Sequence, residues 1–345
     1  MASSASKRAR WRRSASRRRS GASAARNNTA TATTGTASSP PQGACGRFAP
    51  TPSGPLHLGS LLAAAGSYLS ARSRGGRWLL RIDDLDRNRC IPGLETQFQT
   101  TLEIFGFEWH GTVNFQSDRI DTYAEALSAL QAAGYSYPCR CSRSDIAAAQ
   151  AADPALEPVY PGTCRDQSPT DGGPHALRFR IDPEQPDIMF EDLLQGPVRQ
   201  DCRREAGDFV IQRRNGFFAY HLAVVVDDER QGVTEVVRGS DLLSSTPRQI
   251  LLQRALGFRT PRYGHLPLLT EPDGRKLAKS RRAVPLEPRH APRQLWQVLN
   301  WLEQGPPAGL ARAPVGEIWR WAIANWRPER LEGWRERRLE DQEPP

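Results

Sequence analysis

The sequence has 345 residues, a formal net charge of +9 and six cysteines, and it contains no run of 18 apolar residues. A chain of this length buries a large core and is expected to form one main domain with appendages. The lack of a long apolar run argues against a membrane-spanning helix. The uneven spacing of the cysteines argues against a disulfide-stapled secreted fold and favours a reducing cytoplasm.

The positive charge is concentrated at the N-terminus. Residues 1–45 carry nine basic residues and no acidic one, whereas the remaining 300 residues carry 38 of each sign. The segment is rich in Ser, Ala, Thr and Arg and is predicted to be a disordered basic tail. It resembles an organellar transit peptide in composition and also suits a basic arm for RNA phosphates, but we favour an extension without a function.

The first predicted helix follows a rigid turn in residues 47–60. Apolar residues recur at helical spacing from Leu58 to Leu69, and Ser53 or Pro55 is expected to open the helix. His57 and Gly59 then fall at the first turn, where unpaired N–H groups and the helix dipole favour an anion. His57 would add a hydrogen-bond donor, and Gly59 would allow a ligand to approach the backbone. The alternative for His57 is a purely structural histidine.

The next elements alternate between strand and helix. Residues 78–82 read as a buried strand, and helical patterns cover residues 94–105 and 123–134. This alternation predicts an α/β fold with a doubly wound parallel sheet, whose first half occupies residues 46–134. Ligands of such sheets bind at the carboxyl ends of the strands, where the His57 turn and Asp83 are expected to meet.

Residues 135–205 are expected to be a loop-rich insertion that carries a cysteine cluster. Cys139, Cys141 and Cys164 are close enough in sequence to surround a tetrahedral zinc ion, with Pro158, Pro161 and Gly162 shaping the loop between them. Free buried thiols are the alternative. The role of the metal would be structural.

Residues 206–290 are predicted to form the second half of the sheet. Asn215-Gly216 indicates a hairpin between residues 209–211 and 217–220, and residues 223–228 read as a buried strand that ends in two carboxylates. Two of the only three lysines, Lys276 and Lys279, lie in one pentapeptide, while 44 arginines supply the other positive charges. Lysine offers a mobile point charge that suits a polyphosphate; two surface lysines are the alternative.

The C-terminal region, residues 291–345, is predicted to be short and helical. It contains six of the nine tryptophans, and apolar residues recur at helical spacing in residues 295–302 and 315–322. Aromatic platforms for RNA bases are one interpretation of the tryptophans. Ordinary helix packing is the interpretation that we favour.

These motifs together resemble a known enzyme family. His57-Leu-Gly-Ser60 and Lys276-Leu-Ala-Lys-Ser280 resemble the two signatures of class I aminoacyl-tRNA synthetases. Residues 47–54, 81–86 and 237–241 resemble the glutamyl branch, and the whole set is most similar to its short paralogues, the glutamyl-Q tRNA(Asp) synthetases. The resemblance implies a class I Rossmann-like fold with a zinc-containing insertion. A glutamyl-tRNA synthetase that reads an anticodon has a large further C-terminal domain, for which this chain is expected to be too short.

The resemblance also implies a reaction and its participants. ATP, with Mg²⁺, would activate L-glutamate as glutamyl-adenylate, and the glutamate would pass to the queuosine base in the anticodon loop of tRNA(Asp). The implied catalytic residues are His57, Lys276 and Lys279, with His57, Gly59 and Lys279 at the ATP. The implied glutamate-binding residues are Arg47, Phe48, Ala49, Pro50, Thr51, Asp83, Tyr220 and Arg238. An ion pair of Arg238 with Glu235 or Asp241 is the structural alternative.

The implied ligands of one structural Zn²⁺ are Cys139, Cys141, Tyr160 and Cys164, with Asp166 or His175 as alternatives to the tyrosine.

Two positions depart from the family pattern: Asp83 stands where glutamate is frequent, and Ala278 stands where serine is usual. Three other functions stay open. They are a truncated glutamyl-tRNA synthetase that charges tRNA(Glu), a non-catalytic tRNA-binding paralogue, and a transferase that modifies a protein or small molecule. A cytoplasmic monomer is expected.

Overall fold

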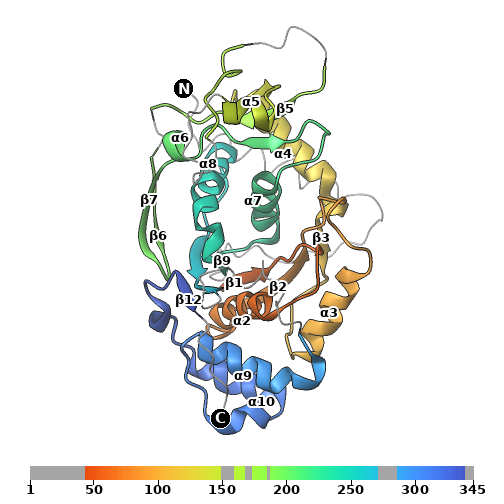
Figure 1. The fold of residues 1–345 in the computed structure, drawn as a ribbon, viewed down its shortest axis with the longest axis vertical. Coiled ribbons are helices and arrows are strands. Elements are labelled where there is room, and N and C mark those ends of the chain that lie inside the picture. Colours follow the sequence, from red (N-terminus) through yellow and green to blue (C-terminus); the bar gives the residue numbers. More distant parts are fainter. Residues whose placement is uncertain (1–42, 149–158, 168–172, 185–186, 271–285, 339–345) are drawn as a thin grey trace, which may run out of the picture.

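The computed structural model describes residues 43–148, 159–167, 173–184, 187–270 and 286–338, and its centre is a parallel sheet (Figure 1). Strand β1 (Cys45–Phe48) pairs with β2 (Arg77–Ile82), which pairs with β3 (Asn114–Phe115). Strands β9 (Glu235–Gly239) and β10 (Arg262–Leu266) form a second parallel pair beside β1. The N–H of Thr234, just before β9, donates to the carbonyl of Cys45 in β1 at 2.9 Å. The predicted parallel sheet is confirmed.

Helices cover both faces of this sheet, so the predicted doubly wound arrangement is also confirmed. One hydrophobic core joins the sheet to helices α2, α3, α9 and α10 (Leu58–Arg72, Leu94–Ile104, Ala291–Trp301 and Val315–Asn325). A second core joins it to α4, α7 and α8 (Ile120–Ala132, Tyr220–Gln231 and Thr246–Leu256). Successive residues of β2 divide between them: Trp78 and Leu80 enter the first core and Leu79 the second. Burial on both faces explains why the strand is apolar throughout.

The predicted strand at residues 223–228 is wrong, because this segment lies inside helix α7. The helix begins after an extended Ala219 and ends at Gly232, which has the left-handed φ of 69° that a helix C-terminus commonly requires. All residues from Leu222 to Asp228 are buried. A helix that is buried all round shows no amphipathic period, so its short valine run is indistinguishable from a buried strand in the sequence.

The insertion contains more regular structure than its sequence indicates. Its elements are β4 (Ser136–Cys139), α5 (Arg143–Ala148), β5 (Ala176–Phe179), β6 (Asp187–Asp192), β7 (Gly196–Asp201) and α6 (Cys202–Glu205). Strands β4 and β5 form an antiparallel sheet with β8 (Val210–Gln212), which lies beyond the predicted boundary at residue 205. The hairpin β6–β7 pairs through β6 with β10 of the central sheet. The loop-rich expectation is wrong because β4, β5 and β6 pair with strands distant in sequence.

The predicted turn at Asn215-Gly216 is present, but the second strand of its hairpin is not. Gly216 has a φ of 85°, and the Ala219 N–H donates to the Ile211 carbonyl. Only one bridge, Gln212 to Phe218, follows the turn before α7 begins at Tyr220.

The C-terminal region forms the two predicted helices, α9 and α10, and packs against α2 and α3. Trp319 and Trp326 are buried, and the Trp319 indole N–H donates to the Phe105 carbonyl at 2.8 Å. Core packing therefore accounts for these two tryptophans. An unpredicted strand, β12 (Glu336–Arg338), pairs with β11 (Leu268–Thr270) next to the carboxyl end of β10. Within the described ranges, no helix is long and apolar enough to cross a membrane.

Gly106, which follows α3, packs closely against Val315 and Trp319 of α10, and its replacement by alanine tests this contact. Gly106 has a φ of 73°, and a Cβ atom there would lie 2.4 Å from Val315 Cγ1. Gly111 has a similar φ of 75° but nothing within 4 Å. We expect G111A to lower the free energy of unfolding by about 1–2 kcal/mol through backbone strain alone. G106A should lower it by roughly 1–3 kcal/mol more through overpacking, as measured by urea unfolding. Equal losses in the two variants would contradict this packing.

Candidate active site

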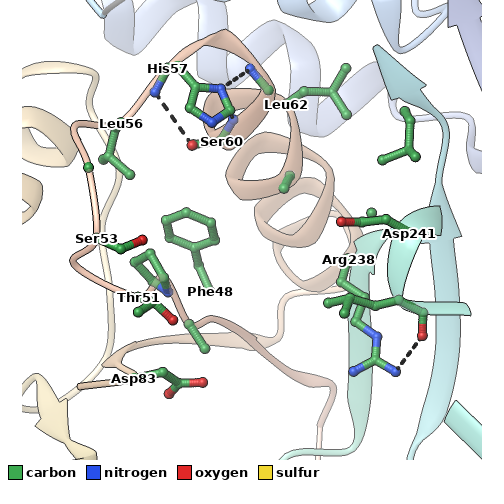
Figure 2. Close-up of a pocket in the computed structure, with 18 of the residues that line it drawn as sticks. Phe48, Thr51, Ser53, Leu56, His57, Ser60, Leu62, Asp83, Arg238 and Asp241 are labelled. Atoms are coloured by element: carbon green, nitrogen blue, oxygen red, sulfur yellow. Dashed lines mark hydrogen bonds between the residues drawn. The ribbon is translucent and has the colours of Figure 1, made fainter. Parts of the chain in front are cut away.

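A cavity of about 640 Å³ opens at the carboxyl ends of β1, β2, β9 and β10 (Figure 2). This is the edge at which ligands of doubly wound sheets bind. All eight residues predicted to contact glutamate line it: Arg47, Phe48, Ala49, Pro50, Thr51, Asp83, Tyr220 and Arg238. His57 and Gly59, predicted at the nucleotide, line the same cavity. Sequence reasoning missed most of its apolar wall, which includes Leu56, Leu62, Phe98, Val224 and Leu268.

His57 is the N-cap of α2, so the helix begins two residues or more after the expected start (Figure 2). Its Nδ1 accepts hydrogen bonds from the N–H groups of Gly59 (3.1 Å) and Ser60 (3.4 Å). The sequence predicts that the unpaired N–H groups of this first turn favour an anion, but two of them donate to the imidazole ring of His57. A neutral imidazole that accepts at Nδ1 carries its proton on Nε2, which makes Nε2 the donor of this side chain.

Gly59 is required by this cap. A Cβ atom at position 59 would lie 3.0 Å from the Cε1 of His57, tighter than ordinary van der Waals contact. The glycine thus gives room to the histidine ring, in addition to lining the cavity.

Arg238, at the end of β9, is held by neutral groups. Its Nε donates to His265 Nε2 (3.1 Å) and its Nη1 to the Tyr220 hydroxyl (3.3 Å). Its Nη2 donates to the Leu242 carbonyl (3.3 Å) and to Thr246 Oγ1 (2.8 Å). Glu235, one alternative partner, pairs instead with Arg74 and with Arg262. The guanidinium lines the cavity without a carboxylate among these four acceptors.

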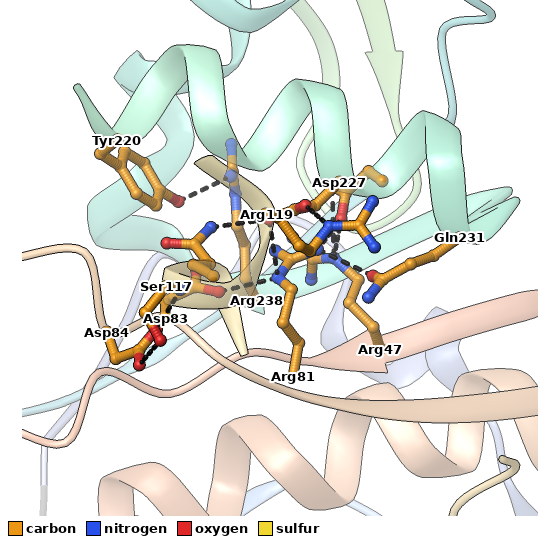
Figure 3. Close-up of polar contacts among 12 residues, drawn as sticks. Arg47, Arg81, Asp83, Asp84, Ser117, Arg119, Tyr220, Asp227, Gln231 and Arg238 are labelled. Atoms are coloured by element: carbon orange, nitrogen blue, oxygen red, sulfur yellow. Dashed lines mark hydrogen bonds and ion pairs between the residues drawn. The ribbon is translucent and has the colours of Figure 1, made fainter. Parts of the chain in front are cut away.

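Asp83 belongs to a buried ionic network centred on Arg81 (Figure 3). The fully buried Arg81 donates to Asp83 and to Asp228, both at 2.7 Å, and lies 3.7 Å from Asp227. The Arg47 Nε donates to Asp228 at 3.3 Å. Asp227 in turn accepts from the side chains of Gln116, Arg119 and Tyr123. Three carboxylates and three guanidiniums balance one another, and the network fixes the orientation of Asp83 at the cavity.

The protonation state of Asp83 depends on its burial. Burial raises the pKa of Asp83 to about 6, although the ion pair and hydrogen bond with Arg81 oppose the rise. The carboxyl group is therefore neutral below pH 6 and ionised above it. A cationic ligand placed against Asp83 would favour the ionised form.

The three cysteines of the insertion come together around Tyr160. The Sγ atoms of Cys141 and Cys164 are 3.6 Å apart, and the Tyr160 hydroxyl lies 3.4 Å from Cys139 Sγ and 3.8 Å from Cys141 Sγ. Two thiolates at 2.3 Å from a tetrahedral zinc ion lie about 3.8 Å apart, so these residues fit such a metal. Neither Asp166, which pairs with Arg180, nor His175 belongs to the cluster of possible ligands among the described residues.

The thiols of this cluster differ in acidity. Burial raises the pKa of Cys141 to about 11. Burial also opposes ionisation of Cys164, but hydrogen bonds from the Arg140 backbone and from Tyr160 outweigh it and lower the pKa of Cys164 to about 7. Sequence reasoning missed Arg178, whose Nε donates to Cys139 Sγ at 3.1 Å and whose guanidinium lies 3.7 Å from the centre of the Tyr160 ring.

Lys276 and Lys279 lie outside the described residues, in the range 271–285. The chain enters that range at the end of β11, next to Leu268 and Leu269 of the cavity wall. It leaves the range at Leu286, whose N–H donates to the carbonyl of Leu56, another residue of the wall. The described residues on both sides of the lysine motif are thus anchored at the cavity.

Comparisons with known proteins agree with this geometry. The family model for the catalytic domain of class I tRNA synthetases (E and Q) matches residues 45–289. The glutamyl-Q tRNA(Asp) synthetase of Geobacter sulfurreducens is 50% identical over 301 residues, which cover 85% of this chain and 95% of that protein. The protein of the same name from Chromobacterium violaceum is 51% identical over 287 residues, covering 83% and 94%.

Among solved structures, the glutamate-tRNA synthetase of Elizabethkingia anophelis superposes with a TM-score of 0.71 at 23% sequence identity, covering 87% of this chain and 68% of that one. This likeness shows the shared fold. The family match and the curated relatives confirm the resemblance that the two signature motifs indicated, and this chain therefore belongs to the class I aminoacyl-tRNA synthetases of the glutamyl and glutaminyl family.

Proposed function

We propose that this protein activates glutamate with ATP and transfers it to the queuosine base in the anticodon loop of tRNA(Asp). The observation that carries the activation step is one cavity that holds a buried carboxylate, Asp83, and a buried guanidinium, Arg238, beside the His57 cap. The acceptor is supported by relatives about 50% identical over more than nine tenths of their length, which are named glutamyl-Q tRNA(Asp) synthetases.

The polar groups of the cavity match those of glutamate. The Asp83 carboxylate would bind the α-ammonium group, and Arg238 would bind a carboxylate. Tyr220 and the segment Phe48–Thr51 would orient the substrate, and Arg47 would add positive charge next to it. Arg47 shares its charge with Asp228, whereas the acceptors of Arg238 are neutral, so Arg238 is the stronger anion-binding group.

Adenylation would follow from position and charge. An oxygen of the α-carboxylate attacks the α-phosphorus of ATP, the bond to the bridging oxygen breaks, and pyrophosphate leaves with Mg²⁺. The Nε2–H of His57 would donate to a phosphate oxygen, Gly59 would lie against the nucleotide, and Lys276 and Lys279 would hold the departing phosphates. In the second step the acceptor attacks the glutamyl carbonyl carbon and AMP leaves.

A single structural Zn²⁺ would be held by Cys139, Cys141, Cys164 and the Tyr160 oxygen. Bound there, it would cross-link β4 to the loop of residues 159–167, which lies outside the central sheet. We assign it no part in the chemical steps.

Radiolabelled glutamate distinguishes the possible acceptors. The purified protein is incubated with ATP, labelled glutamate and either queuosine-containing tRNA(Asp), the same tRNA transcribed without queuosine, or tRNA(Glu). We expect label only on the first, and a K279A variant should reduce both labelling and pyrophosphate exchange by orders of magnitude. Label on tRNA(Glu) would instead identify a charging enzyme. Exchange without labelling of any tRNA would point to a different acceptor, and absence of exchange would refute the activation step.

The pKa of Asp83 predicts how glutamate binding depends on pH. Because the carboxyl group becomes neutral below about pH 6, its attraction for the α-ammonium group is lost there, and kcat/KM for glutamate should fall about tenfold per pH unit below 6. Pyrophosphate exchange between pH 5 and 8 measures this, with kcat/KM for ATP as the internal control. The D83N variant should show low, pH-independent kcat/KM for glutamate. A wild-type profile that is flat from pH 5 to 8 would exclude this role.

Metal content tests the cysteine cluster independently of activity. We expect about one zinc per wild-type chain and almost none in C139A, because loss of one thiolate breaks the tetrahedral set. Cys202 is equally buried but lies outside the cluster, so C202A is the matched control and should keep its zinc. Elemental analysis of the purified proteins gives the answer, and equal zinc in C139A and wild type would remove the assignment.

A further inference from the structure

A buried chain of hydrogen bonds connects the insertion hairpin to the candidate active site. Asp192, at the end of β6, lies 2.5 Å from Nδ1 of His265 on β10, and Arg238 donates to the opposite ring nitrogen at 3.1 Å. His265 is fully buried, and Asp192 and Arg238 are 2% and 6% exposed. Tyr263 supports the chain from one side, stacked on His265 with its ring 5.5 Å from the Arg238 guanidinium.

The contacts of Asp192 fix the proton positions in this chain. Its Oδ1 accepts three backbone N–H groups, those of Leu194, Gln195 and His265, at 3.0 to 3.1 Å. Burial opposes ionisation of Asp192, but the hydrogen bond from the His265 ring and those from the backbone N–H groups of Leu194 and His265 outweigh it and hold the pKa of this carboxyl below its usual value. A carboxylate that faces Nδ1 places the imidazole proton there, so Nε2 keeps the lone pair that Arg238 requires.

The imidazole also stays uncharged. Burial lowers the pKa of His265, and the charge of Arg238 adds to this effect although Asp192 opposes it. The ring thus orients the guanidinium without neutralising it, which a carboxylate in the same place would do. The four contacts of Arg238 use four of its five N–H donors and leave one on Nη1, beside Tyr220 in the cavity wall.

We propose that Asp192 and His265 are positioning residues that hold Arg238 in the orientation and charge state needed to bind a carboxylate of the amino-acid substrate. This inference rests on the proposed function, in which Arg238 contacts glutamate. It predicts that the pair acts on glutamate affinity and leaves ATP affinity unchanged, because the Nε2 atom of His265 faces Arg238 and Thr246.

Two substitutions of His265 separate this role from a contribution to folding. In H265Q the amide oxygen reaches the place of Nε2 and still accepts from Arg238. In H265N the amide reaches only the place of Nδ1, so the contact with Asp192 remains and the acceptor for Arg238 is lost. H265N should raise the KM for glutamate by about tenfold or more, the effect of removing one hydrogen bond to a charged group. H265Q should stay within about threefold of wild type, and the KM for ATP should not change in either variant.

The control is His110, a partly buried histidine whose Nδ1 accepts the N–H of Trp78 near the start of β2; neither residue lines the cavity. H110Q should leave both KM values at wild-type levels. A purely structural role of His265 would lower the amount of active protein, and hence the apparent kcat, without selectively changing the KM for glutamate.

The tautomer of His265 supplies a readout that does not depend on activity. With ¹⁵N-labelled histidine, the resonances lost in H265N should show a protonated Nδ1 and an unprotonated Nε2 from pH 6 to 8. The opposite tautomer would overturn the inference, as would an unchanged KM for glutamate in H265N. If the wild-type protein shows no glutamate-dependent pyrophosphate exchange, the proposed function itself is refuted. If the wild type exchanges normally and H265N has the same KM for glutamate, only the role of Asp192 and His265 is refuted.

Discussion

The buried charge of Arg81 is the constraint on which the rest of the site depends. This guanidinium lies at the end of β2 with no exposed surface, and a charge so placed is stable only if carboxylates accept its hydrogen bonds. Asp228 of α7 and Asp83 of the segment after β2 accept hydrogen bonds from it, and Asp227 of α7 adds a negative charge 3.7 Å away. Because these acids come from two elements, α7 and the segment after β2, their contacts with Arg81 also align α7 with the strand ends.

The same alignment creates the cavity. With α7 fixed across the carboxyl ends of β1 and β2, its first residue, Tyr220, reaches Arg238 at the end of β9. The N-cap of α2 closes the other side, where the His57 ring uses two helix amides and leaves its own Nε2 as the donor. The polar groups that line the cavity therefore come from β1, the segment after β2, the α2 cap, α7 and β9, which meet at this edge of the sheet.

Two arginines of the cavity differ in the groups that accept their hydrogen bonds. Arg47 donates to the Asp228 carboxylate, so its charge is largely compensated inside the protein. Arg238 donates to an imidazole, two hydroxyls and a carbonyl, so its charge remains available to an anion. Sequence alone presents them as equivalent candidates for a carboxylate, and only their neighbours distinguish them.

The sequence by itself determined the features that local order encodes. The α2 turn with His57 and Gly59, the β2 strand with Asp83 beyond it, and the Cys139, Cys141 and Cys164 spacing all follow from residues close together in the chain. Only the tertiary structure decided that residues 223–228 are helical, because burial on all sides hides the helical period. It likewise decided that Asp192 and His265 meet Arg238. The pairings of β10 with β6 and β9 bring together segments that are distant in the chain, and no local sequence pattern predicts such pairings.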